Sequence, residues 1–311
     1  MTIPEPKLIL LLSEIWTMTD PRDLRQVVRY AVEAEEAGFD AVMIGEHVVM
    51  GPNSAYKGAP ENPRDWLMAG NQPSMFPHPS GMHQLSAISS VTSRINLLAA
   101  AVLSPLRHPL LLAKEFATID LLSEGRLIVL PAVSWQEEEY AALNVPFHKR
   151  GAILDEQLEI WSKLWRDGSP VAYDGQHYNF IDTYVEPQPY KPGGVTLWTG
   201  GRTLIPPILR RVVRYSSGLF LLQPPSPEEL DQIAAAMSDA GRNMSELDLA
   251  VLVRADFTDA TGVLDLETAI APARKLRERG FNSFIIKPSQ FIDDGKQIGA
   301  FCREVVQRIK G

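Results

Sequence analysis

The stretch Phe39-Asp40-Ala41-Val42-Met43-Ile44 decides the fold class, because every residue in it except Asp40 is apolar. A strand with one face in water alternates apolar and polar residues, whereas a continuous apolar run fits a strand that is covered on both faces. The run therefore predicts one strand of a parallel sheet with helices packed on both of its faces.

The same pairing of a short apolar run with a longer amphipathic segment recurs along the chain. Residues 21–37, before the quoted stretch, are predicted to form a helix with Asp20 as N-cap, Pro21 in the first turn and Gly38 at the end. Eight strands, each followed by a helix, are predicted to begin near positions 7, 39, 95, 126, 195, 218, 247 and 282.

Two α/β architectures are compatible with this alternation of strands and helices. One is a closed (β/α)8 barrel, also called a TIM barrel, and the other is an open doubly wound sheet. An open sheet that binds a dinucleotide carries Gly-x-Gly-x-x-Gly after its first strand. That place reads Ser13-Glu14-Ile15-Trp16-Thr17 and has no glycine. Together with eight repeats of one kind, this favours a single TIM-barrel domain over residues 1–311.

Two connections are too long to be simple turns and are predicted to be insertion loops. The first, about residues 48–81, is rich in Pro, Gly, Asn and Met. The second, about residues 169–194, contains Asp174-Gly175 between aromatic residues, which indicates a small hairpin.

Composition narrows the classes of function. The 311 residues carry a formal net charge of -8, and a nucleic-acid partner is not expected, because phosphate binding needs a basic face. The single cysteine, Cys302, excludes an intramolecular disulfide and is expected to be buried in the last helix. No signal-peptide pattern and no membrane-length apolar run is found, so we expect a cytoplasmic protein without a membrane partner.

Polar strand ends are the candidate site residues, because TIM barrels place their chemistry at the C-terminal ends of the strands. These ends read Ser13-Glu14, Glu46-His47, Ala132-Val133-Ser134-Trp135, Thr199-Gly200-Gly201-Arg202 and Lys287. His, Asp and Glu do not cluster with metal-ligand spacing, so no metal is expected.

His47 is the leading catalytic candidate, since it follows an apolar strand and precedes the long loop 48–81. An imidazole at that place can donate a proton or polarise a carbonyl. Glu46 has two interpretations: it acts directly in catalysis, or it orients His47 or pairs with a neighbouring basic group.

Gly200-Gly201-Arg202 lies between a strand and a helix. Glycines let a ligand approach the backbone, free N–H groups at a helix start favour an anion, and Arg202 adds a positive charge. A tight turn explains the glycines alone, but the arginine favours a phosphate site.

Further motifs appear in a fixed order along residues 8–218. They are Ala34-Glu35-Glu36-Ala37-Gly38-Phe39-Asp40 followed by Gly45-Glu46-His47, Thr92-Ser93-Arg94-Ile95, Pro105-Leu106-Arg107-His108-Pro109, Ala113-Lys114 with Ala117-Thr118-Ile119-Asp120, Leu122-Ser123-Glu124-Gly125-Arg126, Phe147 with Arg150-Gly151 and Asp155-Glu156, and Gly200-Gly201. Each is weak alone, but the ordered set resembles the bacterial luciferase-like oxidoreductases, which use FMN or the 8-hydroxy-5-deazaflavin coenzyme F420.

The resemblance implies a flavin-type ring stacked over the strand ends. His47 matches the family's strand-two histidine, which lies at the ring and often acts in proton transfer. Ala100 and Ala101 match the position where the family commonly carries a non-proline cis peptide behind the ring. Gly200, Gly201 and Arg202 match a segment near the cofactor phosphate or side chain.

The segment after strand four departs from the family pattern Gly-Val-Gly-x-Gly-Trp, whose glycines let the backbone approach the cofactor. It reads Leu130-Pro131-Ala132-Val133-Ser134-Trp135. Ala132 and Ser134 are small, Ser134 can donate its hydroxyl to a phosphate, and Pro131 removes an N–H. Ala132, Ser134 and Trp135 are predicted to contact the cofactor, with altered affinity.

The Arg-His-Pro motif and the Phe-x-x-Arg-Gly motif followed by Asp-Glu look most like the F420-dependent members. The resemblance then implies hydride transfer between F420 and a small, largely apolar organic substrate, with His47 moving the accompanying proton. Within the family, the alternative is an FMN-dependent monooxygenase that uses reduced flavin and oxygen. An alternative of another class is a cofactor-poor barrel that binds a ligand or a partner without catalysis.

Loop 48–81 carries enough apolar surface to line a pocket or a dimer interface. We expect Trp16, Trp66, Met75 and Phe76 to contact the substrate. Barrels of this family are usually dimers, so a homodimer is expected.

Overall fold

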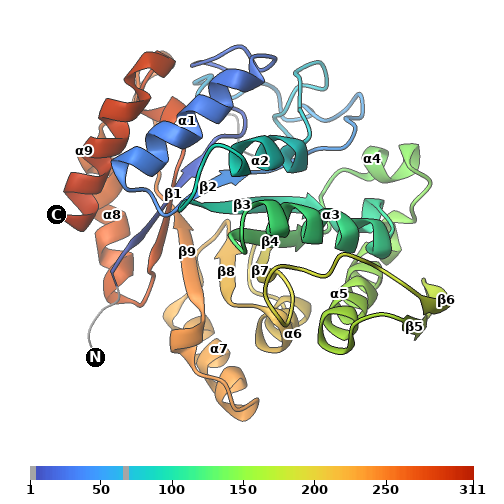
Figure 1. Ribbon diagram of the computed structural model, residues 1–311. Helices are drawn as coiled ribbons and strands as arrows, with labels where there is room; N and C mark the ends of the chain where they lie inside the picture. Colours follow the sequence, from blue (N-terminus) through green and yellow to red (C-terminus); the bar gives the residue numbers. More distant parts are fainter. Residues whose placement is uncertain (1–4, 66–69) are drawn as a thin grey trace.

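The computed structural model describes residues 5–65 and 70–311, which form a closed barrel of eight parallel strands surrounded by helices (Figure 1). Around the barrel the strand order is β1, β10, β9, β8, β7, β4, β3, β2. Their bounds are β1 (Lys7–Leu11), β2 (Ala41–Ile44), β3 (Asn96–Leu103), β4 (Leu127–Ala132), β7 (Thr196–Gly201), β8 (Gly218–Leu221), β9 (Asp248–Leu252) and β10 (Ser283–Ile286). The predicted TIM barrel, with its eight strands, is confirmed.

Helices cover the outside of the barrel (Figure 1). They are α1 (Leu24–Ala37), α2 (Gly81–Ser89), α3 (Pro109–Leu122), α5 (Arg150–Asp167), α6 (Pro206–Tyr215), α7 (Pro227–Asp239), α8 (Leu266–Glu278) and α9 (Ile298–Lys310). The short helix α4 (Glu137–Ala142) follows β4 and places Glu139 against the segment after β2. Cys302 on α9 is buried, as predicted.

The start of α1 differs from the prediction. The helix begins at Leu24, and its N-cap is Asp23, whose side chain accepts a hydrogen bond from the backbone N–H of Gln26. Asp20 instead accepts from the backbone N–H of Arg22 at 2.8 Å. Two aspartates three residues apart both offer a cap, and the later one is used. The predicted end is correct, because Gly38 adopts the left-handed conformation with φ of 99°.

The quoted stretch is buried on both faces, as its pattern predicts. All four residues of β2 are buried. Ala41 and Met43 pack inside the barrel with the other inward side chains, whereas Val42 and Ile44 pack between the strands and the helices. This arrangement brings the C-terminal end of β2, and hence Glu46 and His47, to the rim of the barrel.

The hairpin predicted within residues 169–194 is confirmed. β5 (Val171–Asp174) and β6 (Asn179–Thr183) form the predicted antiparallel hairpin, closed by a hydrogen bond from the Gly175 N–H to the Tyr178 carbonyl. The loop after β2 crosses toward β9 and β10, where the Asn62 side chain donates to the carbonyls of Asp259 and Gly262.

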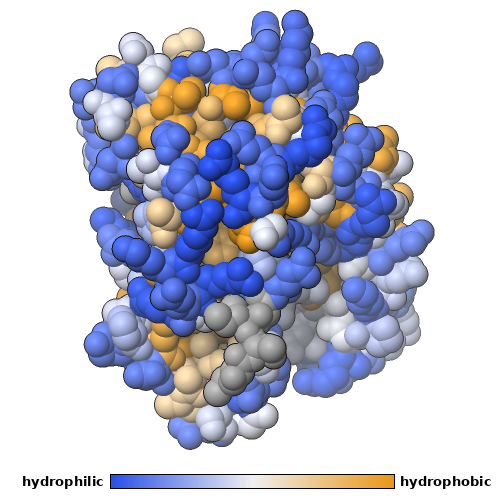
Figure 2. Space-filling view, turned by 90° about the vertical axis from the view of Figure 1, so that its left-hand side faces the viewer, coloured by the Kyte–Doolittle hydropathy of each residue, from blue (hydrophilic) through white to orange (hydrophobic). Residues whose placement is uncertain are grey.

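The face that carries α8 and α9, at the left of Figure 1, is largely hydrophilic, with apolar side chains visible between the charged ones (Figure 2). Within residues 5–65 and 70–311, every helix is too short or too polar to cross a bilayer.

Candidate active site

A cavity of about 740 Å³ opens at the C-terminal ends of the strands. Its lining includes residues that follow β1, β2, β4 and β7, so it lies at the end of the barrel where the sequence predicts the chemistry. The barrel interior contributes apolar side chains to the lining, namely Leu11, Met43, Leu130, Phe220 and Leu252. The volume is within the range of ligand-binding pockets.

Ala100 and Ala101 form part of the cavity lining, and the peptide bond between them is cis. The predicted non-proline cis peptide is therefore confirmed. Gly45 packs against it so closely that a Cβ atom at position 45 would lie 2.8 Å from the Ala100 carbonyl oxygen. Any side chain at residue 45 would displace this part of the lining.

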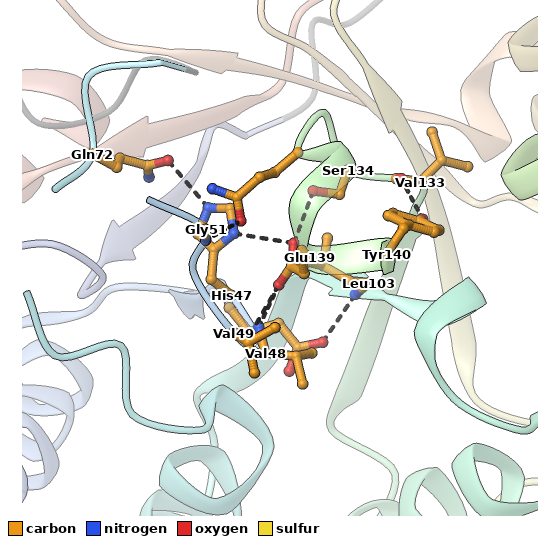
Figure 3. A network of polar contacts seen from close by, with 12 residues as sticks. His47, Val48, Val49, Gly51, Gln72, Leu103, Val133, Ser134, Glu139 and Tyr140 are labelled. Carbon is orange, nitrogen blue, oxygen red and sulfur yellow. Dashed lines mark hydrogen bonds and ion pairs between the residues drawn. The ribbon is translucent and has the colours of Figure 1, made fainter. Parts of the chain in front are cut away.

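His47 lies at the cavity between a carboxylate and an amide (Figure 3). Its Nδ1 is 3.4 Å from Oε2 of Glu139 on α4, and its Nε2 is 3.1 Å from Oε1 of Gln72 in loop 48–81. Only 9% of the His47 side chain is exposed. Burial disfavours the imidazolium, but the hydrogen bond with Glu139 and the charges of Glu139 and Glu14 outweigh burial and raise the pKa of His47.

Glu139 connects His47 to the start of loop 48–81 (Figure 3). Its Oε1 accepts hydrogen bonds from the backbone N–H groups of Val48, at 2.6 Å, and Val49, at 3.3 Å. The Ser134 hydroxyl donates to Oε2 at 3.3 Å. The Glu139 side chain is fully buried, and these donors compensate the loss of water around its carboxylate.

A second carboxylate, Glu14, contacts the other side of Gln72. The Gln72 side-chain amide donates a short hydrogen bond to Oε1 of Glu14, and Lys287 Nζ lies 4.0 Å from Oε2. Burial raises the pKa of Glu14, against the opposing charges of Lys287 and His47. Lys287 is fully buried, which lowers its pKa to about 8 even though Glu14 and Asp65 favour its charged form. We call His47, Glu139, Ser134, Gln72 and Glu14 the His47 wall.

Glu46 pairs with Arg107 and forms no hydrogen bond with His47 in the described part of the chain. Its two carboxylate oxygens accept from Nη1 and Nη2 of Arg107 at 2.7 and 2.8 Å, and Oε1 also accepts from the Leu103 N–H. This geometry supports the interpretation that Glu46 meets a neighbouring basic group. A direct catalytic role for Glu46, which also lines the cavity, stays a prediction.

Two buried polar atoms at the cavity have no hydrogen-bond partner within the described residues: His78 Nε2 and Gln136 Nε2. The His78 ring lies 5.3 Å from the His47 ring. Burial and the neighbouring charge of His47 lower the pKa of His78 to about 4, so its imidazole is neutral at physiological pH. Buried polar groups normally have partners, so these two atoms are suited to hydrogen bonds with a ligand.

Gly200, Gly201 and Arg202, which we call the Arg202 wall, line another part of the cavity. A Cβ atom at Gly200 would lie 2.7 Å from the Leu130 side chain, and one at Gly201 would overlap Ile208. The glycines therefore make room for neighbouring side chains. The Arg202 guanidinium is exposed and forms no hydrogen bond or ion pair with any residue that the structure describes.

The helix after the Arg202 wall offers fewer free N–H groups than predicted. α6 begins at Pro206, and both Pro206 and Pro207 lack an N–H. The positive charge for an anion at this wall thus comes mainly from Arg202.

The unusual segment after strand four is built into the cavity lining. Ala132, Ser134 and Trp135 all line the cavity, and the Trp135 ring lies 6.1 Å from that of His47. Ser134 has φ of 56°, a left-handed conformation that favours glycine, which explains the glycine of the family pattern at this position. Its hydroxyl donates a hydrogen bond to Glu139. The hydrogen is therefore already used and does not fit the predicted donation to a phosphate.

The predicted substrate residues separate into three groups. Trp16 lines the cavity, and Phe76 packs edge-on against it with ring centroids 4.6 Å apart. Met75 is 92% exposed and does not line the cavity, so its placement does not fit the predicted substrate contact. Trp66 lies outside the described residues.

Sequence reasoning missed Glu139, Gln72 and His78. Glu139 is the last of three consecutive glutamates, Glu137 to Glu139, and such a run is typical of a solvated helix face. Its one signal is the apolar Tyr140 beside it, which shares the buried face of α4. Gln72 and His78 lie in an irregular loop, where no periodicity marks the residues that point inward.

Comparison with known proteins gives relatives over part of the chain. An uncharacterized protein of Mycobacterium tuberculosis is 40% identical over 109 residues, which cover 35% of this chain and 38% of the relative. The F420-dependent glucose-6-phosphate dehydrogenase of Segniliparus rotundus is 28% identical over 181 residues, or 57% of this chain and 48% of the relative. The chain thus matches less than half the length of these two curated relatives.

Solved structures share the fold over the whole chain. The coenzyme F420-dependent tetrahydromethanopterin reductase of Methanopyrus kandleri superposes with a TM-score of 0.70, at 16% identity, and covers 99% of this chain and 100% of that chain. The family model described as luciferase-like monooxygenase matches residues 8–260. The chain therefore belongs to the luciferase-like monooxygenase family.

Proposed function

We propose that this protein is an oxidoreductase that transfers a hydride between coenzyme F420 and a small, largely apolar organic substrate. The observation that carries the proposal is the cavity of about 740 Å³ at the strand ends, which has the Ala100–Ala101 peptide in its lining and the hydrogen-bonded imidazole of His47 beside it. Such a site combines an apolar surface with a positioned imidazole, and hydride transfer to or from an organic molecule can use both.

The residues present fit a deazaflavin ring system. Ala100, Ala101 and Gly45 line the cavity and lack bulky side chains, which leaves room for a planar ring. His78 Nε2 and Gln136 Nε2 need hydrogen-bond partners, which the polar edge of such a ring can supply. Arg202 would hold the anionic side chain of the coenzyme. When bound, coenzyme F420 supplies a carbon centre that gives or accepts a hydride.

His47 holds the proton that accompanies the hydride in this proposal. Glu139 and Gln72 fix the ring from both nitrogens, and the raised pKa of His47 keeps a larger share of it protonated near neutral pH. The protonated ring suits proton donation to a substrate, and the neutral ring suits proton removal in the reverse direction.

The curated relatives support F420 over FMN. Several are named F420-dependent glucose-6-phosphate dehydrogenases, at 27% to 28% identity. The cavity of this chain, however, presents Trp16, Tyr56 and Phe220 together with aliphatic side chains. We therefore propose a substrate that is more apolar than a sugar phosphate.

Titration of the purified protein with F420 and, separately, with FMN tests the proposal. We expect quenching of protein or coenzyme fluorescence to give a dissociation constant in the micromolar range for F420, about 8 kcal/mol of binding free energy, and much weaker binding of FMN. Tighter binding of FMN, with oxygen consumption by the reduced complex, would replace the proposal by a monooxygenase. Absence of binding for both would support a barrel without catalysis.

A further inference from the structure

The His47 wall contains a chain of hydrogen bonds whose directions are fixed by chemistry. Glu14, at the end of strand β1, accepts from the Gln72 amide nitrogen, so the Gln72 carbonyl oxygen faces His47 Nε2 at 3.1 Å. A carbonyl oxygen can only accept, so Nε2 must carry the hydrogen. On the other side of the ring, the Glu139 carboxylate faces Nδ1, which must also carry a hydrogen.

Loss of the Nε2 hydrogen would place two lone pairs opposite each other, on Nε2 and on the Gln72 oxygen. A turned amide would relieve this, but its nitrogen would then leave Glu14, and its oxygen would face the Glu14 carboxylate. That arrangement is acceptable only if Glu14 takes up a proton. Burial raises the pKa of Glu14, and Lys287, whose Nζ lies 4.0 Å from the Glu14 carboxylate, opposes that rise by favouring the ionised form.

We propose that Gln72 is a positioning residue that holds a hydrogen on Nε2 of His47, and that Glu14 sets the orientation of Gln72. A side chain of loop 48–81 thereby controls the protonation of a histidine at the C-terminal end of a barrel strand. Gln72 is 5% exposed, so water competes little for either end of its amide.

Charged and titratable groups from several elements surround His47, Gln72 and Glu14. Glu139 on α4 and Glu14 after β1 favour the protonated imidazole, and the neutral His78 from loop 48–81 packs edge-on against the ring. Lys287 after β10 faces Glu14, and Asp65 acts in turn on Lys287. Together these groups favour the protonated form of His47, with Nε2–H held toward Gln72.

The test is nuclear magnetic resonance of ring-labelled histidine in the protein without any coenzyme. The His47 resonance is assigned by its loss in His47→Ala, and its pKa is measured in wild type, Gln72→Leu, Gln72→Glu and Glu14→Gln. Gln72→Leu removes the acceptor, so the pKa of His47 should fall by about one pH unit. Gln72→Glu restores an acceptor, so the pKa should return to the wild-type value or exceed it.

Trp135→Phe is the matched control, because the Trp135 ring forms a T-shaped pair with the His47 ring, with centroids 6.1 Å apart, and phenylalanine keeps an aromatic ring there. It should leave the pKa of His47 unchanged. Glu14→Gln keeps the shape of the side chain but removes its charge and weakens the acceptor that orients Gln72, so it should also lower the pKa of His47. A smaller fall when Glu14→Gln is added to Gln72→Leu than when it is made in wild type separates the orientation of Gln72 from the loss of charge. Equal His47 pKa values in wild type, Gln72→Leu and Glu14→Gln would overturn the proposal. Because no coenzyme is added, this outcome is independent of whether the protein uses F420.

Discussion

The His47 wall and the Arg202 wall line one cavity but are built in opposite ways. On the His47 wall, both ring nitrogens and both carboxylates have hydrogen-bond partners within the protein. On the Arg202 wall, an exposed guanidinium has no partner among the described residues, and two glycines leave room for packing. The hydrogen-bond partners of His47 therefore come from the protein itself, whereas the charge of Arg202 has no partner among the described residues.

Removal of the imidazole is the most severe change to the His47 wall. His47→Ala should lower turnover with F420 about 10²- to 10⁴-fold, because a positioned general acid or base contributes that much. Thermal unfolding should change far less than activity. His83→Ala is the control, since His83 is exposed on α2 and does not line the cavity. Equal turnover of His47→Ala and His83→Ala would remove His47 from the chemistry.

A milder change alters Glu139, the carboxylate that is hydrogen-bonded to the imidazole. Glu139→Gln should lower the free energy of unfolding by about 2 kcal/mol, because an amide oxygen is a weaker acceptor and the amide N–H₂ would face the donors of Val48, Val49 or Ser134. Urea unfolding measures this. Glu137→Gln on the same helix is exposed and should change stability by only a few tenths of a kcal/mol. Similar values for the two variants would mean that the buried carboxylate does not organise the wall.

On the Arg202 wall, a substitution is expected to affect ligand binding and not folding. Arg202→Gln should weaken F420 binding about tenfold at low salt, with a smaller difference at high salt, since an exposed charge is screened. Unfolding should be unaffected because the side chain has no partner to lose. Arg210→Gln, an exposed arginine of α6, gives the same change of net charge. If both variants weaken binding equally, the effect is one of net charge and not of a specific contact.

The smallest effect is expected at Ser134, whose φ of 56° is unfavourable for a residue with a Cβ. Ser134→Gly and Ser134→Ala both lose the hydrogen bond to Glu139, but only glycine relieves the backbone. The glycine variant should be more stable than the alanine variant by about 1 kcal/mol in chemical denaturation. A more stable alanine variant would show that the strain at this position is negligible.

The fold could be predicted from the sequence because it depends on local patterns. Continuous apolar runs such as residues 39–44 identify the strands, and their number and spacing identify the barrel. The start of α1 could not be predicted in this way, since Asp20 and Asp23 both offer a cap and the helix uses the second. His47 could be found because it interrupts an apolar run at a strand end.

The partners of His47 could not be found in the same way. Glu139 is 92 residues away in sequence and Gln72 is 25 residues away, and neither belongs to a repeating pattern that indicates its direction. Glu14 and Lys287 were visible as polar strand ends, but their meeting through Gln72 depends on the path of loop 48–81. The Ala100–Ala101 peptide was anticipated through the family resemblance, not from the two residues themselves.

Hydrogen exchange of single amides, measured with and without F420, tests the central contrast most directly. The N–H groups of Val48 and Val49, which donate to buried Glu139, should be protected from exchange already in the protein without coenzyme. Addition of F420 should increase protection mainly at residues 200–205. Rapid exchange of Val48 and Val49 that slows only when F420 is added would contradict the account, because the His47 wall would then be assembled by the ligand.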